Sequence, residues 1–188
     1  MTSKEKMSST ETPDLERLRY PIGRFDLDGS VAPGQRQSLI DSIAATPSRM
    51  RAAVAGLDDE RLDTSYRDGG WSIRQLVHHV PDSHLNAYLR FKLALTEETP
   101  TIRTYDEAAW AKLPDSRSTP IDVSLMLLES MHTRWDTLLR NMSASDFDRR
   151  LQHPEWGELD LNTMLRLYEW HGRHHVAHIT GLRVRMGW

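Results

Sequence analysis

The ten residues Trp170-His171-Gly172-Arg173-His174-His175-Val176-Ala177-His178-Ile179 decide the fold and the chemistry that this chain can support. They lie within a pattern of apolar residues at helical spacing that runs from about Asp160 to about Met186. Four of the ten are histidines, and two histidines four positions apart on a helix share one face and can chelate one ion. Helical bundles place metal ligands on inward faces of this kind. The stretch therefore predicts a bundle helix that carries a metal site.

The stretch contains two pairs at this spacing, and helical phase separates His171 and His175 from His174 and His178. At about 100° per residue, His171 lies about 40° from His175 around the helix axis. His178 lies about 60° from it and His174 about 100°. The apolar residues that share the face of His175 are Leu161, Met164, Tyr168, Ile179, Leu182 and Met186. His171 and His175 are therefore expected in the interior, and the other two beside the site or at the surface.

A pair of buried imidazoles indicates a metal ion more strongly than a lone buried histidine does. A buried polar ring needs a hydrogen-bond partner, and an ion supplies one for both rings at once. The alternative is that each ring is a core histidine satisfied by a backbone carbonyl. A metal site needs at least one further ligand, and it must come from another part of the chain.

The second helical segment offers His78, His79 and His84 as that further ligand. Phase places His79 closer to the interior than His78, but Pro81 can shift the register of the helix. His84 would be central only in a helix that runs straight through Pro81, which we do not expect. The apolar face from which this phase is measured consists of Ile73, Leu76, Val77 and Val80.

The absence of cysteine narrows the kind of metal site. Structural zinc sites are closed by four protein ligands and usually include sulfur, whereas three imidazoles leave a position for water or substrate. All-imidazole sites suit zinc, and also nickel, iron or copper. The prediction is one divalent ion per chain, zinc first and nickel second. His132 and His153 have no partner at ligand spacing, so we expect structural or surface roles for both.

Four helical segments with apolar stripes account for most of the chain. The first predicted helix spans about Gln35 to Leu57 and is kinked or broken at Pro47. The second begins at Ser72, the third spans about Thr119 to Asn141, and the fourth spans about Asp160 to Met186. Ser72 and Gln75 form a capping-box pattern at the start of the second helix. Residues 151–161 have a turn signal flanked by rough alternation. The prediction is an all-α four-helix bundle with a small β-hairpin between the third and fourth helices.

Length and composition limit the domain count and the class of protein. The 188 residues suit one domain over 18–188, preceded by a flexible N-terminal tail over 1–17. A net charge of -3 argues against nucleic-acid binding. No apolar run reaches the roughly 18 residues of a membrane span, and no apolar signal segment opens the sequence. We therefore expect a cytoplasmic protein without disulfides. The long connection with Trp110 between the second and third helices favours a loop that covers a site.

Several motifs together give the chain a family resemblance. They are Tyr20-Pro21-Ile22-Gly23-Arg24-Phe25, Gly69-Gly70-Trp71-Ser72-Ile73-Arg74-Gln75-Leu76-Val77-His78-His79, Asp82-Ser83-His84-Leu85-Asn86-Ala87-Tyr88, His153-Pro154-Glu155 and the histidine-rich stretch quoted above. With them the chain resembles the YfiT-like branch of the DinB superfamily of metal-binding four-helix bundles, from Tyr20 to Trp188.

The resemblance implies one divalent metal held by three histidines. The first family ligand is the histidine eight positions after the tryptophan at the helix start, which here is His79 after Trp71. The other two match His171 and His175. The resemblance further implies a metal-dependent hydrolase, homodimeric and cytoplasmic, that acts on a small molecule. Some relatives are instead thiol S-transferases that use a low-molecular-weight thiol.

A three-histidine site is compatible with hydrolysis and with thiol transfer. A divalent ion lowers the pKa of bound water to roughly 7, and it equally favours loss of the proton from a bound thiol. No residue stands out as the general base; the carboxylates of Asp82, Glu155, Glu158 and Glu169 are expected to be ordinary surface groups. The remaining alternative is a non-catalytic bundle stabilised by its metal, which predicts a fourth protein ligand.

Overall fold

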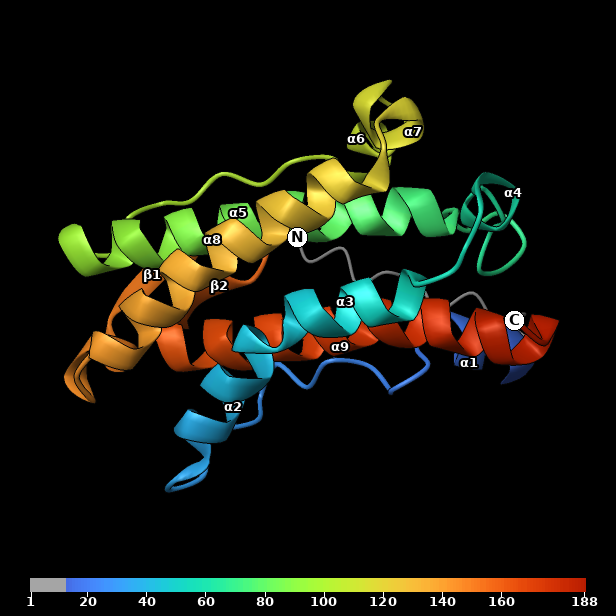
Figure 1. Ribbon diagram of the computed structural model, residues 1–188. Helices are drawn as coiled ribbons and strands as arrows, with labels where there is room; N and C mark the ends of the chain where they lie inside the picture. Colours follow the sequence, from blue (N-terminus) through green and yellow to red (C-terminus); the bar gives the residue numbers. More distant parts are fainter. Residues whose placement is uncertain (1–12) are drawn as a thin grey trace.

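The structure is a computed structural model that describes residues 13–188, and its long helices form a four-helix bundle (Figure 1). The bundle consists of α2 (Gln35–Ala44) with α3 (Thr46–Val54), α5 (Ile73–Thr96), α8 (Ile121–Asn141) and α9 (Leu161–Met186). Shorter helices are α1 (Pro13–Arg19), α4 (Asp59–Leu62), α6 (Glu107–Trp110), α7 (Asp115–Ser118) and the 3-10 turn Ser145–Asp148. The predicted all-α four-helix bundle is confirmed. In residues 13–188 no helix combines the length and apolar character needed to cross a bilayer.

Local sequence explains where the long helices begin and end. The Ser72 hydroxyl accepts a hydrogen bond from the backbone N–H of Gln75 at 3.2 Å, and the Gln75 side chain accepts one from the N–H of Ser72 at 2.9 Å. This is the predicted capping box of α5. The Asp160 carboxylate caps α9 by accepting from the N–H of Thr163 at 2.7 Å. Pro47 lies in the first turn of α3, so the first predicted helix is split there, as expected.

The helices are connected in an order that places α3 diagonally opposite α5 and α8 diagonally opposite α9, while α5 and α8 pack side by side. α5 packs mainly against α8 and α9, and the α2–α3 segment packs against the same two helices (Figure 1). α3 and α9 run in one direction, and α5 and α8 run in the other. Side-chain contacts agree: Phe91 meets Trp135 toward the C-terminal ends of α5 and α8, and His78 meets Ser124 toward their N-terminal ends. The adjacent pair α5 and α8 is therefore parallel.

This parallel pairing explains the long connection between α5 and α8. The chain leaves α5 at one end of the bundle and must enter α8 at the other. A helix of 24 residues is about 36 Å long at 1.5 Å per residue, so residues 97–120 must return over that distance. They do so along one side of the bundle and form α6 and α7 near the start of α8 (Figure 1). Trp110, which lies in this connection, is 38% exposed, and its ring packs at a tilt against that of Tyr105, with centroids 4.3 Å apart.

Pro81 does not interrupt α5, so the expectation of a break there was wrong. The proline lacks the N–H that would continue the helical hydrogen-bond ladder, which disfavours a helix interior. More than half of the side chains of α5 are nevertheless buried. Packing on this scale outweighs the local cost at one position. The residues after Pro81 therefore keep the phase of those before it.

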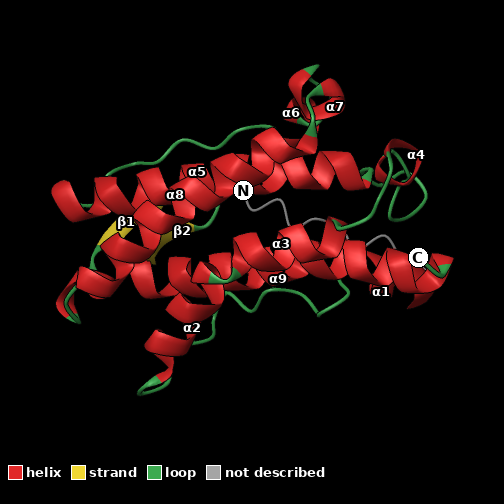
Figure 2. Ribbon diagram, viewed as in Figure 1, coloured by secondary structure: helices red, strands yellow, loops and turns green. Residues whose placement is uncertain are grey.

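The hairpin and the N-terminal segment complete the fold. The strands β1 (Arg150–His153) and β2 (Gly157–Asp160) pair antiparallel between α8 and α9, which confirms the predicted hairpin (Figure 2). Residues 1–12 of the predicted tail lie outside the described residues, and residues 13–17 lie in α1. The segment after α1 lies along α9, where the carbonyl of Gly23 accepts from Trp170 Nε1 at 3.1 Å.

Candidate metal centre

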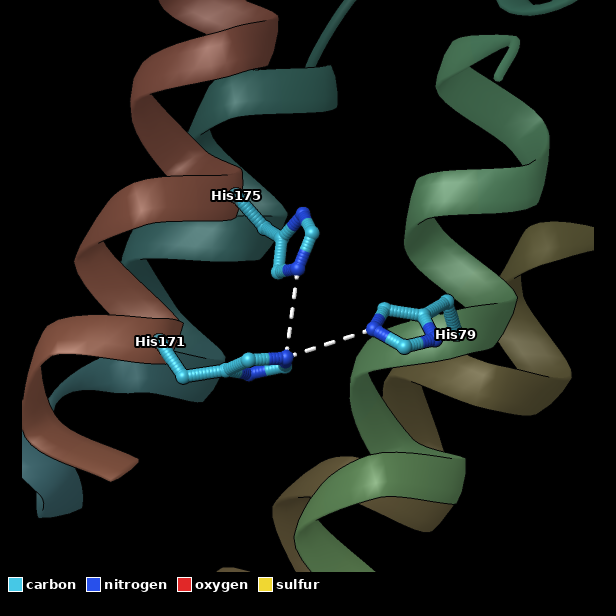
Figure 3. Close-up of side chains that lie close together, drawn as sticks. All are labelled: His79, His171 and His175. Atoms are coloured by element: carbon cyan, nitrogen blue, oxygen red, sulfur yellow. Dashed lines mark hydrogen bonds between the residues drawn. The ribbon is translucent and has the colours of Figure 1, made fainter. Parts of the chain in front are cut away.

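Three imidazole nitrogens converge between α5 and α9 (Figure 3). The Nε2 atom of His171 lies 3.2 Å from that of His79 and 3.2 Å from that of His175. The ligand atoms of all three residues lie within 4.8 Å of one another, and this is the only such group of histidine or carboxylate side chains within residues 13–188. The structure thus brings together the three residues predicted as ligands. Their role as ligands remains a prediction.

The spacing and protonation of these nitrogens fit a divalent cation. Nitrogens bound to zinc at 2.0–2.1 Å in a tetrahedron lie about 3.3 Å from one another, close to the two separations of 3.2 Å observed here. Burial lowers the pKa of His79 to about 4 and the pKa values of His171 and His175 well below the ordinary value. All three are therefore neutral at pH 7, the form that binds a metal.

Close contact between α9 and α3 holds the histidine-bearing face in position. Gly172 follows His171, and a Cβ atom at this position would lie 2.8 Å from Oγ1 and 3.0 Å from Cγ2 of Thr46. The same Cβ would lie 3.5 Å from Cε1 of His84. Only a residue without a side chain lets the two helices approach this closely. Gly172 therefore helps to place His171 and His175 against α5.

His84 is central to the site, contrary to expectation. Because α5 continues through Pro81, the His84 side chain points into the bundle, where it is 0% exposed. Its Nε2 atom lies 3.1 Å from Nδ1 of His171. Burial, and next the nearby His132, keep the pKa of His84 well below its usual range.

Polar and aromatic side chains beside the three histidines were missed by the sequence analysis. The Ser83 hydroxyl lies 3.4 Å from Nε2 of His171, and its position four residues after His79 was a usable signal. The ring of Trp71 lies 4.7 Å from that of His79 between centroids. The Tyr105 hydroxyl is buried beside Ser83. Tyr105 belongs to the long connection, where no spacing rule applies.

The remaining histidines have partners away from the centre or at its edge. His174 and His178 are both buried, and the ring of Tyr20 from the N-terminal segment packs near His174, with centroids 6.0 Å apart. The Nε2–H of His178 donates to the Arg19 carbonyl at 3.1 Å. His174 stacks on Trp170 at 4.3 Å between centroids. A surface position, one of the two roles expected for this pair, is thus wrong for both.

His78 and His153 have hydrogen-bond partners outside the metal centre that satisfy their buried ring nitrogens. His78 Nε2–H donates to the Thr119 carbonyl at 3.1 Å, and its Nδ1 lies 2.7 Å from the Ser124 hydroxyl. His153 Nδ1 accepts from the N–H groups of Glu155 and Trp156 in the hairpin turn, at 3.2 and 3.3 Å. The structural role expected for His153 agrees with these contacts.

The four carboxylates weighed as ordinary surface groups divide into two kinds. Glu158 pairs with Arg150, and Glu169 pairs with Arg173 at 2.6 Å. Glu155 is exposed. Asp82 differs, because burial, and next the repulsion from Asp115, raise its pKa to about 6.

Comparisons with known proteins agree with this architecture. The sequence pattern of the DinB superfamily matches residues 42–179. Two relatives named "Putative metal-dependent hydrolase", from Bacillus mycoides (strain KBAB4) and Bacillus cereus (strain 03BB102), are 49% and 51% identical over 93% of this chain and 100% of their own length.

A solved structure is similar over nearly its whole length. YfiT from Bacillus subtilis, described as a probable metal-dependent hydrolase with an unusual four-helix bundle topology, is 47% identical with a TM-score of 0.88. The match covers 92% of this chain and 99% of that one. By sequence, by fold and by the order of its helices, this chain belongs to the YfiT-like branch of the DinB superfamily.

Proposed function

We propose that the protein is a metal-dependent hydrolase in which His79, His171 and His175 hold one divalent ion, zinc or nickel, with a position left for a small-molecule substrate. The observation that carries the proposal is the convergence of three neutral imidazoles without a fourth histidine or a carboxylate in the group, as far as residues 13–188 are concerned. Closed structural zinc sites use four protein ligands. The names of the relatives support the same class of activity.

The side chains around the centre supply what a hydrolytic site needs from the protein. A bound divalent ion would favour loss of a proton from water, and equally from a thiol. The Ser83 hydroxyl, 3.4 Å from His171 Nε2, is placed to hydrogen-bond a substrate atom beside the ion. The Tyr105 hydroxyl is buried beside Ser83, and burial raises its pKa, so it keeps its hydrogen at neutral pH and is a donor available to a substrate. The Trp71 ring packs against the His79 ring, with centroids 4.7 Å apart, and adds an apolar surface beside the centre.

The first alternative is transfer of a low-molecular-weight thiol to an electrophile at the same centre. Three neutral imidazoles leave the ion its full positive charge, which favours the thiolate as much as it favours hydroxide. The second alternative, a metal that only stabilises the bundle, receives less support, because the group within the described residues contains three ligands rather than four.

Activity of the metal-loaded protein separates these functions. Zinc- or nickel-loaded protein is incubated with generic esters and amides, and separately with an electrophile and a panel of small thiols. We expect metal-dependent hydrolysis without added thiol. Loss of the electrophile only when a thiol is present would select thiol transfer. Equal rates for the loaded protein and its His79→Ala variant in both assays would reject catalysis at this centre.

The proposal includes a homodimer located in the cytoplasm. Large apolar side chains remain exposed on α5 and α8, which supports an interface there: Leu85, Leu89, Leu93, Val123, Met126 and Leu127. Light scattering on the purified protein measures its mass in solution. A mass of one chain at micromolar concentration would contradict the dimer.

A further inference from the structure

A row of imidazoles leads from the metal centre to the opposite side of the bundle. Nδ1 of His171 lies 3.1 Å from Nε2 of His84, and Nδ1 of His84 lies 2.9 Å from Nε2 of His132. Nδ1 of His132 lies 2.9 Å from the backbone carbonyl oxygen of Ile43. The row therefore connects α9, α5, α8 and the end of α2, all four segments of the bundle.

The carbonyl at the end of the row fixes the direction of every hydrogen bond in it. A carbonyl oxygen can only accept, so Nδ1 of His132 carries a hydrogen and donates it. A neutral imidazole has one N–H, so Nε2 of His132 accepts from Nδ1–H of His84. By the same rule Nε2 of His84 accepts from Nδ1–H of His171. The Nε2 atom of His171 is then left with its lone pair, directed at His79 and His175.

Burial supports the neutral form that this reasoning requires. His84 is 0% and His132 2% exposed. Burial lowers the pKa of His132, the residue that donates to the carbonyl, to about 4. The indole of Trp135 packs edge-on against His84 and His132, with centroids 5.8 and 5.6 Å away, which limits rotation of both rings.

We propose that His84 and His132 are positioning residues that hold the metal ligand His171 in its Nδ1–H form, through a hydrogen-bond relay anchored on the Ile43 carbonyl. Neither residue touches the ion or the substrate. The role of the relay in metal binding rests on the proposed metal site. Which ring nitrogens of the relay carry a hydrogen is a property of the metal-free protein as well. Metal-bound histidines generally donate their second ring N–H to a partner that fixes ring orientation and tautomer. Here that partner is a second histidine, itself fixed by a third.

The arrangement distinguishes His171 from its neighbour on the same helix. Nδ1 of His175 is buried and has no hydrogen-bond partner among the described residues. In the metal-free protein the Nε2–H of His175 can instead donate to the Nε2 lone pair of His171, a tautomer that must change before Nε2 of His175 can bind an ion. We expect His171 to be the ligand whose geometry is set before any ion arrives.

Nitrogen NMR of the metal-free protein with labelled histidine tests the proton order directly. The His171 signals are assigned by their loss in His171→Ala. We expect His171 to be protonated on Nδ1 and bare on Nε2, and to become a mixture of tautomers in His84→Leu. The matched control is His78→Leu, which removes another buried histidine of α5 whose partners are Thr119 and Ser124. A His171 ring protonated on Nε2 in the wild type, or unchanged in His84→Leu, would overturn the relay.

Zinc affinity, measured by competition with a chromophoric chelator, tests the purpose of the relay. Loss of a partner of this kind weakens metal binding by about 10- to 100-fold, and we expect that loss in His84→Leu. His84→Gln keeps an acceptor for the N–H of His171 and should recover most of the affinity, while His78→Leu should leave it unchanged. Wild-type affinity in His84→Leu would overturn the proposal.

Two further measurements separate the relay from the metal site and from folding. If the wild type binds no divalent metal, the proposed metal site fails, while the NMR result still decides the proton order. Circular dichroism checks that each variant is folded. Should His84→Leu fail to fold, His132→Phe cuts the relay one step further from the ligand and keeps a ring against Trp135. Part of the same tautomer change is expected there, and its absence would remove His132 from the relay.

Discussion

At the scale of single residues, the partner of each imidazole carries more information than its burial. His78 and His79 are neighbours and both are buried. His78 is satisfied by a carbonyl and a hydroxyl, whereas Nε2 of His79 faces another imidazole nitrogen 3.2 Å away. In the metal-free protein one of these two nitrogens can donate its hydrogen to the other, whereas a cation between them would be held by the lone pairs of both. Such convergence fits the proposal that His79 is a ligand.

Removing one ligand should abolish tight metal binding without unfolding the bundle. We expect His175→Ala to lose stoichiometric zinc, because two remaining imidazoles do not make a tight site. The matched control is His174→Ala, which removes the preceding buried histidine, one that the ligand group does not include. Elemental analysis after purification and circular dichroism measure both properties. Stoichiometric metal in His175→Ala would reject the ligand assignment.

Asp82 should weaken the fold as the pH rises. Its pKa is raised to about 6 in the folded chain, above the value of 3.8 for a free side chain, so folding is opposed once the carboxyl is ionised. The penalty is absent at low pH, grows between about pH 4 and 6, and is complete above that range. Asp82→Asn should therefore stabilise the protein more at pH 8 than at pH 5. Urea unfolding of both proteins measures the difference, and an equal or reversed effect at the two values would contradict it.

At the scale of helices and strands, local sequence signals predicted where the helices begin better than whether they continue through a proline. The caps at Ser72 and Asp160 follow from short-range hydrogen bonds, which a sequence displays directly. Pro47 and Pro81 look alike in sequence. Pro47 lies in the first turn of a new helix, α3. Pro81 lies inside α5, where the packing of the helix outweighs the cost of the missing backbone hydrogen bond. That difference depends on contacts with other helices, so no local pattern reports it.

The misjudged proline also limited what could be said about the site. Without a known phase beyond Pro81, the residues alone left His78, His79 and His84 as alternatives, and the family resemblance chose His79. The pair on α9 was predictable because no proline interrupts that helix. His84 could not be placed, although its phase in an unbroken α5 points to the interior.

Replacing Gly172 with alanine should destabilise the fold, because the added methyl group would lie 2.8 Å from Thr46 Oγ1. We expect Gly172→Ala to lower the free energy of unfolding by about 1–3 kcal/mol, the usual cost of overpacking a core. Gly181→Ala on the same helix is the matched control. Its Cβ would meet nothing nearer than the flexible end of Arg185 at 3.6 Å, so a helix propensity gain of up to about 1 kcal/mol is expected. Chemical denaturation compares the two. Equal effects would show that α9 can move away from α3.

At the scale of the whole molecule, every histidine has a pKa lowered by burial, including His153 in the hairpin. Nine neutral histidine side chains is an unusually large number for one domain of 188 residues. Each must remain unprotonated in the fold, whereas the unfolded chain takes up protons below about pH 6.5. Protonation therefore pulls the chain toward the unfolded state.

The metal-free protein should lose stability steeply on mild acidification. The stabilisation by neutral histidines is fully present above about pH 6.5 and is lost as the pH falls toward the lowered pKa values, about 4 for His79 and His132. Urea midpoints at pH 8, 7, 6 and 5 should fall progressively below pH 7. A constant midpoint between pH 7 and 5 would contradict the burial of these side chains as neutral groups.

The diagonal placement of α3 against α5 and of α8 against α9, with α5 and α8 parallel, also governs how the chain can reach its native state. A bundle of sequential antiparallel helices can start from a helical hairpin, in which neighbours in sequence dock at once. Here α3 and α5 face each other across the bundle, as do α8 and α9, so no such nucleus is available. His79 and His171 are 92 positions apart, and their meeting closes a large loop. Rates of folding fall as contacts become less local, so stopped-flow refolding should be slower than for an up-and-down bundle of this size, with the histidine cluster assembled late.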